Sequence, residues 1–146
     1  MNNAGCALVA TALVASMTGC SSGPDQEPLP PGALAPGTAA LTVNDRQLGE
    51  VTSVQCTSAG PLMTITTGDE NSGSTSVVSN ADGLAAQSVY LRNVGGFTGS
   101  YNLDLGGNAE VSMTGGTYAI TGSAAGFDTE QPSFRTEATF EIKAAC

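Results

Sequence analysis

Hydrophobic and polar residues alternate along most of the chain after residue 40. Side chains at every second position share one face of a β-strand, so this period indicates extended structure. The clearest case is the last segment, in which Phe134, Thr136, Ala138, Phe140 and Ile142 are predicted to face a core. The residues between them are polar or charged and are predicted to face solvent.

Eight shorter segments show the same alternation and are separated by residues typical of turns. They lie around residues 41–43, 54–56, 63–67, 77–78, 89–91, 101–105, 111–113 and 118–120. Helical periodicity is absent from this region, apart from one possible helical turn around Ala81–Ala86. The pattern predicts an all-β domain over residues 41–146, an antiparallel β-sandwich or strongly curved sheet of about 8–9 short strands.

Paired glycines mark the turns. Gly115 and Gly116 stand between two alternating runs, which indicates a two-residue hairpin because a type I′ turn needs a positive φ at both positions. The segments 94–97, 97–99 and 104–108 are also interpreted as turns. They do not resemble nucleotide-binding loops, because no helix follows to direct its N-terminus at a phosphate.

The first twenty residues have the features of an export signal. The apolar run from Ala7 to Val14 is too short to span a bilayer permanently, but it suits the hydrophobic core of a signal peptide. It leads to Met17-Thr18-Gly19-Cys20, which resembles the bacterial lipobox. The resemblance implies that the signal peptide, residues 1–19, is removed and that Cys20 carries acyl chains such as palmitate. The alternative is a secreted protein in which Cys20 is unmodified, and the lack of Lys or Arg before the apolar run leaves open whether Met1 is the true start.

Residues 20–40 are predicted to form a disordered Pro/Gly-rich tether. Five of the seven prolines of the chain fall in this segment, and proline fixes φ and favours extended backbone. The tether would begin at the lipidated Cys20 and hold the β domain away from the membrane.

The charge of the chain limits its partners. The sequence has 13 acidic and four basic residues, a formal net charge of −9. Nucleic acid binding is not expected, because it needs clustered Lys and Arg to neutralise phosphates. The expected membrane contact is therefore through acyl chains on Cys20 and not through the surface of the folded domain.

Two cysteines follow Cys20. In an oxidising compartment Cys56 and Cys146 are predicted to form one structural disulfide, which would join the last residue to the second predicted strand. The alternative is a pair of free, buried thiols.

Candidate catalytic groups are few. The chain contains no histidine, so Ser-His and Cys-His nucleophile pairs are not expected. Two acidic clusters, Asp69-Glu70 and Asp128 with Glu130, are interpreted as solvated turn residues; calcium binding is the alternative, although their spacing matches no known calcium loop. We predict no catalytic residues, no metal and no cofactor.

Several segments together resemble the mycobacterial nineteen-kilodalton lipoprotein antigen (LpqH-like) family. The resemblance rests on the lipobox, Leu41–Asn44, Val54–Thr57, Val89–Phe97, Thr117–Gly122, and Phe140–Lys143 followed by Cys146. It implies an exported, outward-facing lipoprotein anchored to the cell membrane or envelope, whose acylated terminus is sensed by host Toll-like receptors. Family members are also described as glycosylated adhesins. The Thr-rich glycosylated tether of the prototype is replaced here by proline, so heavy mannosylation is not expected.

Three classes of function follow from these observations. A non-catalytic surface lipoprotein with a structural or host-interaction role is favoured. A small-ligand or lipid-binding carrier is the second class, and it would need a large apolar cavity between the sheets. An enzyme is the third, and it would need a buried cluster of acids in a cleft.

Overall fold

The computed structural model describes residues 27–146. Cys20, the predicted signal peptide and the first residues of the predicted tether lie outside this range. The described part contains ten strands: β1 (Ala39–Val43), β2 (Arg46–Val51), β3 (Val54–Ala59), β4 (Leu62–Gly68), β5 (Gly73–Ser79), β6 (Ala85–Val94), β7 (Phe97–Asn102), β8 (Ala109–Thr114), β9 (Thr117–Asp128) and β10 (Thr136–Ala145). None of the described residues belongs to a helix, which confirms the all-β prediction.

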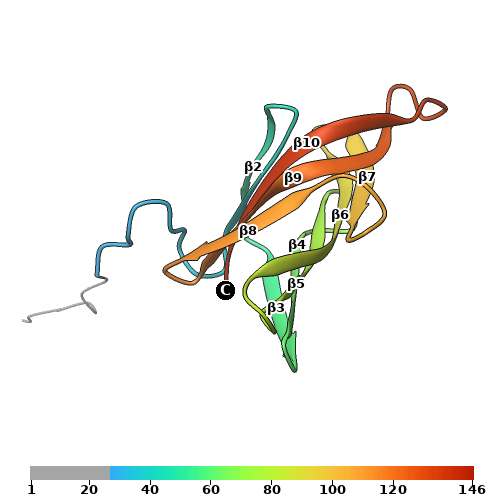
Figure 1. The fold of residues 1–146 in the computed structure, drawn as a ribbon. Helices are drawn as coiled ribbons and strands as arrows, with labels where there is room; N and C mark the ends of the chain where they lie inside the picture. The colour runs from blue at the N-terminus through green and yellow to red at the C-terminus, as the bar shows by residue number, and fades with distance from the viewer. Residues whose placement is uncertain (1–26) are drawn as a thin grey trace, which may run out of the picture.

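All strand pairings are antiparallel, and the strands form one sheet in the order β2-β1-β10-β9-β7-β6-β5-β4-β3. The eighth strand, β8, is not part of this order because β9 pairs with different strands along its two parts. The first half of β9 pairs with β8, whereas its last four residues pair with β7. Figure 1 shows the consequence: β8, β9 and β10 run across the molecule, while β3, β4 and β5 run steeply down it. The sheet therefore curls around an interior.

The core fills this interior with inward-facing side chains from most of the strands. Its largest fully buried members are Leu41, Ile65, Leu91, Ile120 and Ile142, each at most 1 % exposed. The alternation predicted for the last strand is confirmed between Ala138 and Ile142 and continues to Ala144. The predicted burial of alternate residues in the segment around 89–91 is confirmed as well, since Val89 and Leu91 are buried and Tyr90 is exposed.

Phe134 and Thr136 do not face the core as predicted. Phe134 is 71 % exposed, and β10 begins only at Thr136. The chain forms two successive turns before this strand, with the Gln131 amide donating to Asp128 O and the Phe134 amide donating to Gln131 O. In the register of β10 and β9, Phe134 would lie opposite Asp128, but the pairing stops at Thr136 and Gly126 because residues 128–134 form these turns instead.

The alternation after Tyr101 is also misleading. The seventh strand ends at Asn102, and Leu103 and Leu105 are exposed in the following loop. Asp104 has a positive φ of 66°, which turns the chain out of the sheet. The helical turn considered around Ala81–Ala86 does not form, because Ala81 and Gly83 make an isolated bridge and β6 begins at Ala85.

The sheet has ten strands and not eight or nine, because the hydrophobic pattern did not predict one of them. This strand, β2, lies at an edge and pairs only with β1, and its residues are mostly exposed. An exposed edge strand needs no hydrophobic alternation. The available signal was Asn44-Asp45, whose positive φ values of 48° and 62° form the two-residue turn between β1 and β2. As a result, Cys56 lies on the third strand, not the second.

Predicted glycine turns are confirmed. Gly115 and Gly116 have φ values of 54° and 81° and join β8 to β9, with Thr114 paired to Thr117. Gly95 and Gly96 join β6 to β7 in the same way, with Val94 paired to Phe97. The turn predicted at residues 97–99 is wrong, because these residues begin β7.

Candidate functional site

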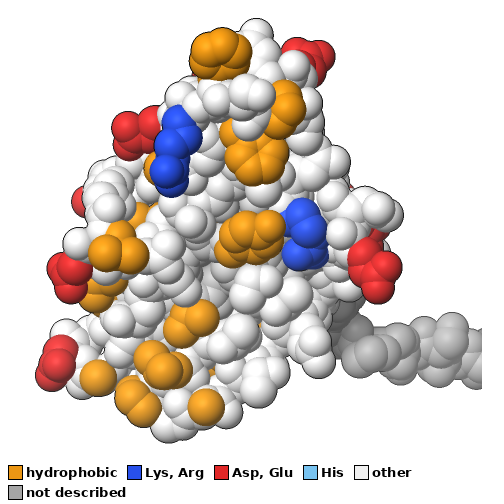
Figure 2. Space-filling view, turned by 90° about the vertical axis from the view of Figure 1, so that its right-hand side faces the viewer, with side chains coloured by type: hydrophobic (Ala, Val, Ile, Leu, Met, Phe, Trp, Pro, Cys, Tyr) orange, Lys and Arg blue, Asp and Glu red, His pale blue; other side chains and the backbone are white. Residues whose placement is uncertain are grey.

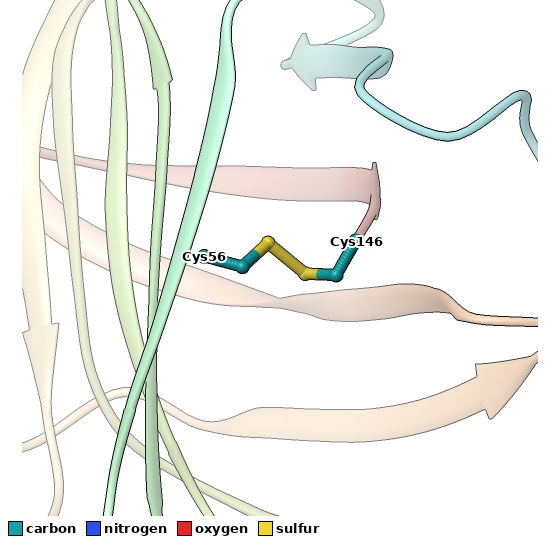
Figure 3. Close-up of a disulfide and its surroundings, with 2 residues drawn as sticks. All are labelled: Cys56 and Cys146. Carbon is teal, nitrogen blue, oxygen red and sulfur yellow. A yellow bond between two sulfur atoms is a disulfide. The ribbon is translucent and has the colours of Figure 1, made fainter.

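The disulfide joins two distant parts of the sheet. Cys56 lies on β3, at one edge of the strand order, and Cys146 follows β10, near the other edge. Their Cα atoms are 5.9 Å apart and 90 residues separate them in sequence. Figure 3 shows the bond bridging the gap between the third strand and the end of the tenth. The predicted disulfide is therefore present, and it fastens the edge strand across the end of the domain.

The chain before β1 is hydrogen-bonded to this same end of the domain. The Gly37 amide donates to Ala145 O at 3.0 Å, and the Ala145 amide donates to Thr38 O at 2.9 Å. The Leu34 amide donates to Thr117 Oγ1 at 2.8 Å. Residues 30–38 of the proline-rich segment thus lie beside the C-terminal residues and the turn between β8 and β9, as Figure 1 also shows. The prediction of a disordered tether is therefore wrong for residues 30–38, and β1 already begins at Ala39.

Pro30 also lies close to this turn. A Cβ atom added at Gly115 would come within 2.7 Å of Pro30 Cγ. The first described residues of the tether therefore reach the domain at Pro30. One end of the domain is formed by the turn between β8 and β9, the C-terminus and residues 30–38. It is called the anchor end below, because residues 30–38 connect the domain to Cys20 along the chain.

The acidic cluster around Asp69 belongs to a turn. The amides of Asn71 and Ser72 donate to Asp69 Oδ1 at 2.7 and 3.0 Å, and Arg92 Nη2 donates to Asp69 O. The hydrogen bonds donated by these two backbone amides, above all that of Ser72, hold the pKa of the Asp69 carboxyl below its ordinary value of 3.8. This carboxylate satisfies amides that the turn would otherwise leave without partners.

The second acidic cluster has a similar role. Asp128 Oδ1 accepts a hydrogen bond from the Glu130 amide at 3.0 Å, and Asp128 Oδ2 lies 3.7 Å from Arg46 Nη1. Within residues 27–146 no group of three or more Cys, Asp or Glu residues is placed to hold a metal ion. The same residues contain no helix long and apolar enough to cross a membrane.

A pH-dependent contribution to stability is expected from Asp69. Because the folded state lowers the pKa of this carboxyl, its contribution is present above its ordinary value of 3.8 and is lost as the pH falls through the lower folded value. Asp69→Ala is expected to lower the melting temperature slightly at pH 7, and the gap from the parent protein should narrow below pH 4. Thermal melts followed by circular dichroism between pH 2 and pH 7 measure this gap, and Glu70→Ala, at the neighbouring exposed acidic residue, is the control. A gap that stays constant over the whole range would contradict the assignment.

The interior of the domain is filled. Apolar side chains from seven strands form one cluster, and partly buried residues including Cys56, Met63 and Val111 pack against it. The polar residues buried with them are Thr67, Ser74, Ser76 and Thr117. Thr67 and Ser74 are bonded to each other at 2.8 Å, whereas the Ser76 hydroxyl has no partner among the described residues. The depressions of the described surface have volumes of about 270–450 Å³ and are lined by strand faces and turns that open to solvent.

Comparison with known proteins connects the fold to a family. The family model for the Mycobacterium 19 kDa lipoprotein antigen matches residues 32–146. A putative lipoprotein of Mycobacterium indicus pranii is 42 % identical over 112 residues, which cover 75 % of this chain and 78 % of that protein. Lipoprotein LpqH of Mycobacterium avium is 33 % identical over 146 residues, covering 92 % of this chain and 90 % of the relative.

A third relative extends the similarity to another species. Lipoprotein LpqH of Mycobacterium tuberculosis (strain ATCC 25618 / H37Rv) is 33 % identical over 147 residues, which cover 94 % of this chain and 92 % of the relative. The family model spans the whole described sheet and both cysteines of the disulfide. The chain therefore belongs to the Mycobacterium 19 kDa lipoprotein antigen family.

Proposed function

We propose that this protein is a lipid-anchored lipoprotein of the cell envelope that carries out no catalysis and presents its β domain to partners outside the cell. In this proposal residues 1–19 are a signal peptide, Cys20 carries the acyl chains, and residues 41–146 are the presented domain. The observation that carries the proposal is the position of Cys20 at the end of a lipobox-like sequence in a chain of a lipoprotein antigen family. Two or more acyl chains hold a protein stably at a membrane, whereas one holds it only marginally.

The contacts of residues 30–38 bear on how the domain would be held. About ten residues separate Cys20 from Pro30, and a fully extended chain of that length spans at most about 35 Å. The anchor end would therefore stay close to the membrane, with the turn between β9 and β10 further away. Since the domain is acidic, it is not expected to lie flat on an anionic lipid surface.

The filled interior supports an interaction role over the carrier alternative. A lipid carrier needs a large apolar cavity to enclose its cargo. In this domain the inward positions are taken by side chains such as Leu91, Ile120 and Ile142, which pack in one cluster. The role proposed here therefore depends on the outer surface of the domain and on the acylated terminus, which is also the part that host Toll-like receptors would sense.

Replacement of the anchor residue tests the proposal. Cys20→Ser is expected to move nearly all of the protein from the detergent phase to the aqueous phase after phase separation, because the acyl chains are the only proposed attachment to the membrane. Cys6→Ser is the matched control and should remain in the detergent phase. Intact-mass measurement of the parent protein should show a polypeptide that begins at Cys20 and carries the mass of the acyl chains.

Two results would contradict this assignment. The first is a parent protein from its native source that is unacylated at Cys20. The second is a Cys20→Ser protein that partitions with detergent as fully as Cys6→Ser. Toll-like receptor signalling in reporter cells gives a further readout, which should be lost in Cys20→Ser and kept in Cys6→Ser.

A further inference from the structure

A groove crosses the outward face of the sheet where β6, β7 and β9 lie side by side. Its volume is about 450 Å³, and the side chains that line it are those of Tyr90, Thr98, Ser100, Ala125, Phe127 and Arg135. The strand register explains why these residues meet on one face: Tyr90 is paired with Ser100, Ser100 with Ala125, and Thr98 with Phe127. Cross-strand partners point to the same side of a sheet.

The floor of the groove is flat because its central side chains are small. Ser100 and Ala125 form the middle of the row, and the backbone of Gly99 and Gly126 lies beside them. The side chains of Tyr90, on β6, and Phe127, on β9, rise on either side and are 44 % and 36 % exposed. These two strands are separated by β7, so the two residues lie about 10 Å apart across the strands, or two strand spacings. Tyr90 is level with Ser100 and Phe127 with Thr98, two residues away along β7.

The groove holds one cation on a protein that is acidic overall. Arg135 lines it, and this guanidinium forms no hydrogen bond or ion pair with any residue from 27 to 146. The residues that line the 450 Å³ depression include no Asp or Glu. Glu137 is paired with Ala125 across the sheet, and it lines an adjoining depression that shares Ser100, Ala125 and Arg135 with the groove. Figure 2 shows hydrophobic side chains spread over one side of the molecule, with basic side chains among them that have acidic side chains nearby. The guanidinium of Arg135 is therefore the feature of the groove that would favour a carboxylate.

The chemistry of the lining distinguishes between classes of ligand. An acyl chain would need a continuous apolar lining, whereas the groove alternates two aromatic rings with the hydroxyls of Thr98 and Ser100. A second copy of this chain would bring a net charge of −9 against another of −9. A sugar has an apolar C–H face that stacks on an aromatic ring and hydroxyls that bond to Ser and Thr, and a carboxylate matches the planar fork of arginine.

We propose that this groove binds an acidic saccharide, whose ring faces stack on Tyr90 and Phe127 and whose carboxylate pairs with Arg135. The groove lies at the half of β9 that pairs with β7, away from the turn between Gly115 and Gly116 at the anchor end. A saccharide chain would thus have access to it while the domain is held at a membrane. The inference concerns the folded domain alone and does not depend on acylation of Cys20.

Titration of the full-length protein with two tetrasaccharides tests this proposal. Tetragalacturonate carries a carboxylate on every ring, and cellotetraose is its neutral counterpart. Isothermal titration calorimetry is expected to show saturable binding of tetragalacturonate that weakens as salt is raised, and at least tenfold weaker binding of cellotetraose. Arg135→Gln should weaken tetragalacturonate binding about tenfold or more, because a hydrogen bond to a charged group is lost.

Matched variants separate the groove from general effects of charge and exposure. Tyr90→Ala and Phe127→Ala should each weaken tetragalacturonate binding several-fold without changing the melting temperature appreciably. Lys143→Gln removes a cation that is paired with Glu141, and Met113→Ala removes an exposed apolar side chain of β8; both should bind as the parent does. The proposal is overturned by equal affinity for the two tetrasaccharides, by the absence of tetragalacturonate binding at millimolar concentration, or by an Arg135→Gln protein that binds like Lys143→Gln.

Discussion

Replacement of both Cys56 and Cys146 with alanine is expected to lower the free energy of unfolding by about 4–5 kcal/mol. The bond closes a loop of 90 residues, and the loss of chain entropy that it imposes on the unfolded state grows with loop length. The loss is a large part of the total, since domains of this size are stable by about 5–15 kcal/mol. It should appear as a lower midpoint in guanidinium chloride, followed by far-ultraviolet circular dichroism.

Reduction of the parent protein provides the control for this experiment. The reduced protein and the double variant should unfold at similar denaturant concentrations, because Cys146 is exposed and Cys56 is only partly buried, so little packing is lost with the sulfur atoms. An oxidised parent and a double variant with the same midpoint would contradict a stabilising role for the disulfide. Free-thiol labelling of the unreduced protein at either cysteine would contradict the bond itself.

The second large effect is expected from Leu91→Ala, which should cost about 2–5 kcal/mol. The Leu91 side chain is 0 % exposed on β6 and its backbone is paired with Ser74 on one side and Gly99 on the other. The side chain belongs to the packed core cluster, whose members can move only partly to fill the cavity that the substitution leaves. The core contains only two buried phenylalanines and no tryptophan, which makes each large aliphatic side chain a substantial part of it.

Leu105→Ala removes the same atoms from a site that is 83 % exposed and should change stability by less than about 0.5 kcal/mol. Denaturant titrations of the two variants, with near-ultraviolet circular dichroism of the three tyrosines as a second signal, measure the difference. Equal destabilisation by both substitutions would contradict the burial assigned to Leu91.

Local patterns predicted the strands that bury one face. In β1 and β10 the buried face is marked by every second residue, so that the period was visible without any knowledge of the neighbouring strands. The glycine turns were predictable for a similarly local reason, since a positive φ is a property of one or two residues. The edge strand β2 was missed because its side chains contact mainly solvent, and its position is decided by pairing with β1.

The exposed positions of Phe134 and Leu105 show the limit of alternation as a signal. Both residues continue a period that holds in the adjoining strand, but the strand stops where the chain enters a turn, although the neighbouring strand continues. The hydrophobic period does not mark where the chain turns. A hydrophobic residue can therefore follow the correct period and still lie outside the core.

The proposed saccharide groove illustrates the same limit for a binding site. Tyr90, Phe127 and Arg135 come from three separate segments, and no motif connects them in sequence. The alternation of residues 89–91 gives no basis for associating Tyr90 with the other two. They meet because β9 leaves β8 and pairs with β7, which brings the ninth strand within two spacings of the sixth.

Amino-acid order alone determined the all-β class, the pairing of the only two cysteines that follow Cys20, the family and the predicted anchor, because each depends on local period, residue type or a short contiguous motif. Tertiary structure decided the strand order, the packing of residues 30–38 against the anchor end, the filled interior and the groove. These features depend on contacts between residues far apart in sequence. Such contacts form only when the complete sheet is paired, and they produce no hydrophobic period within a single segment.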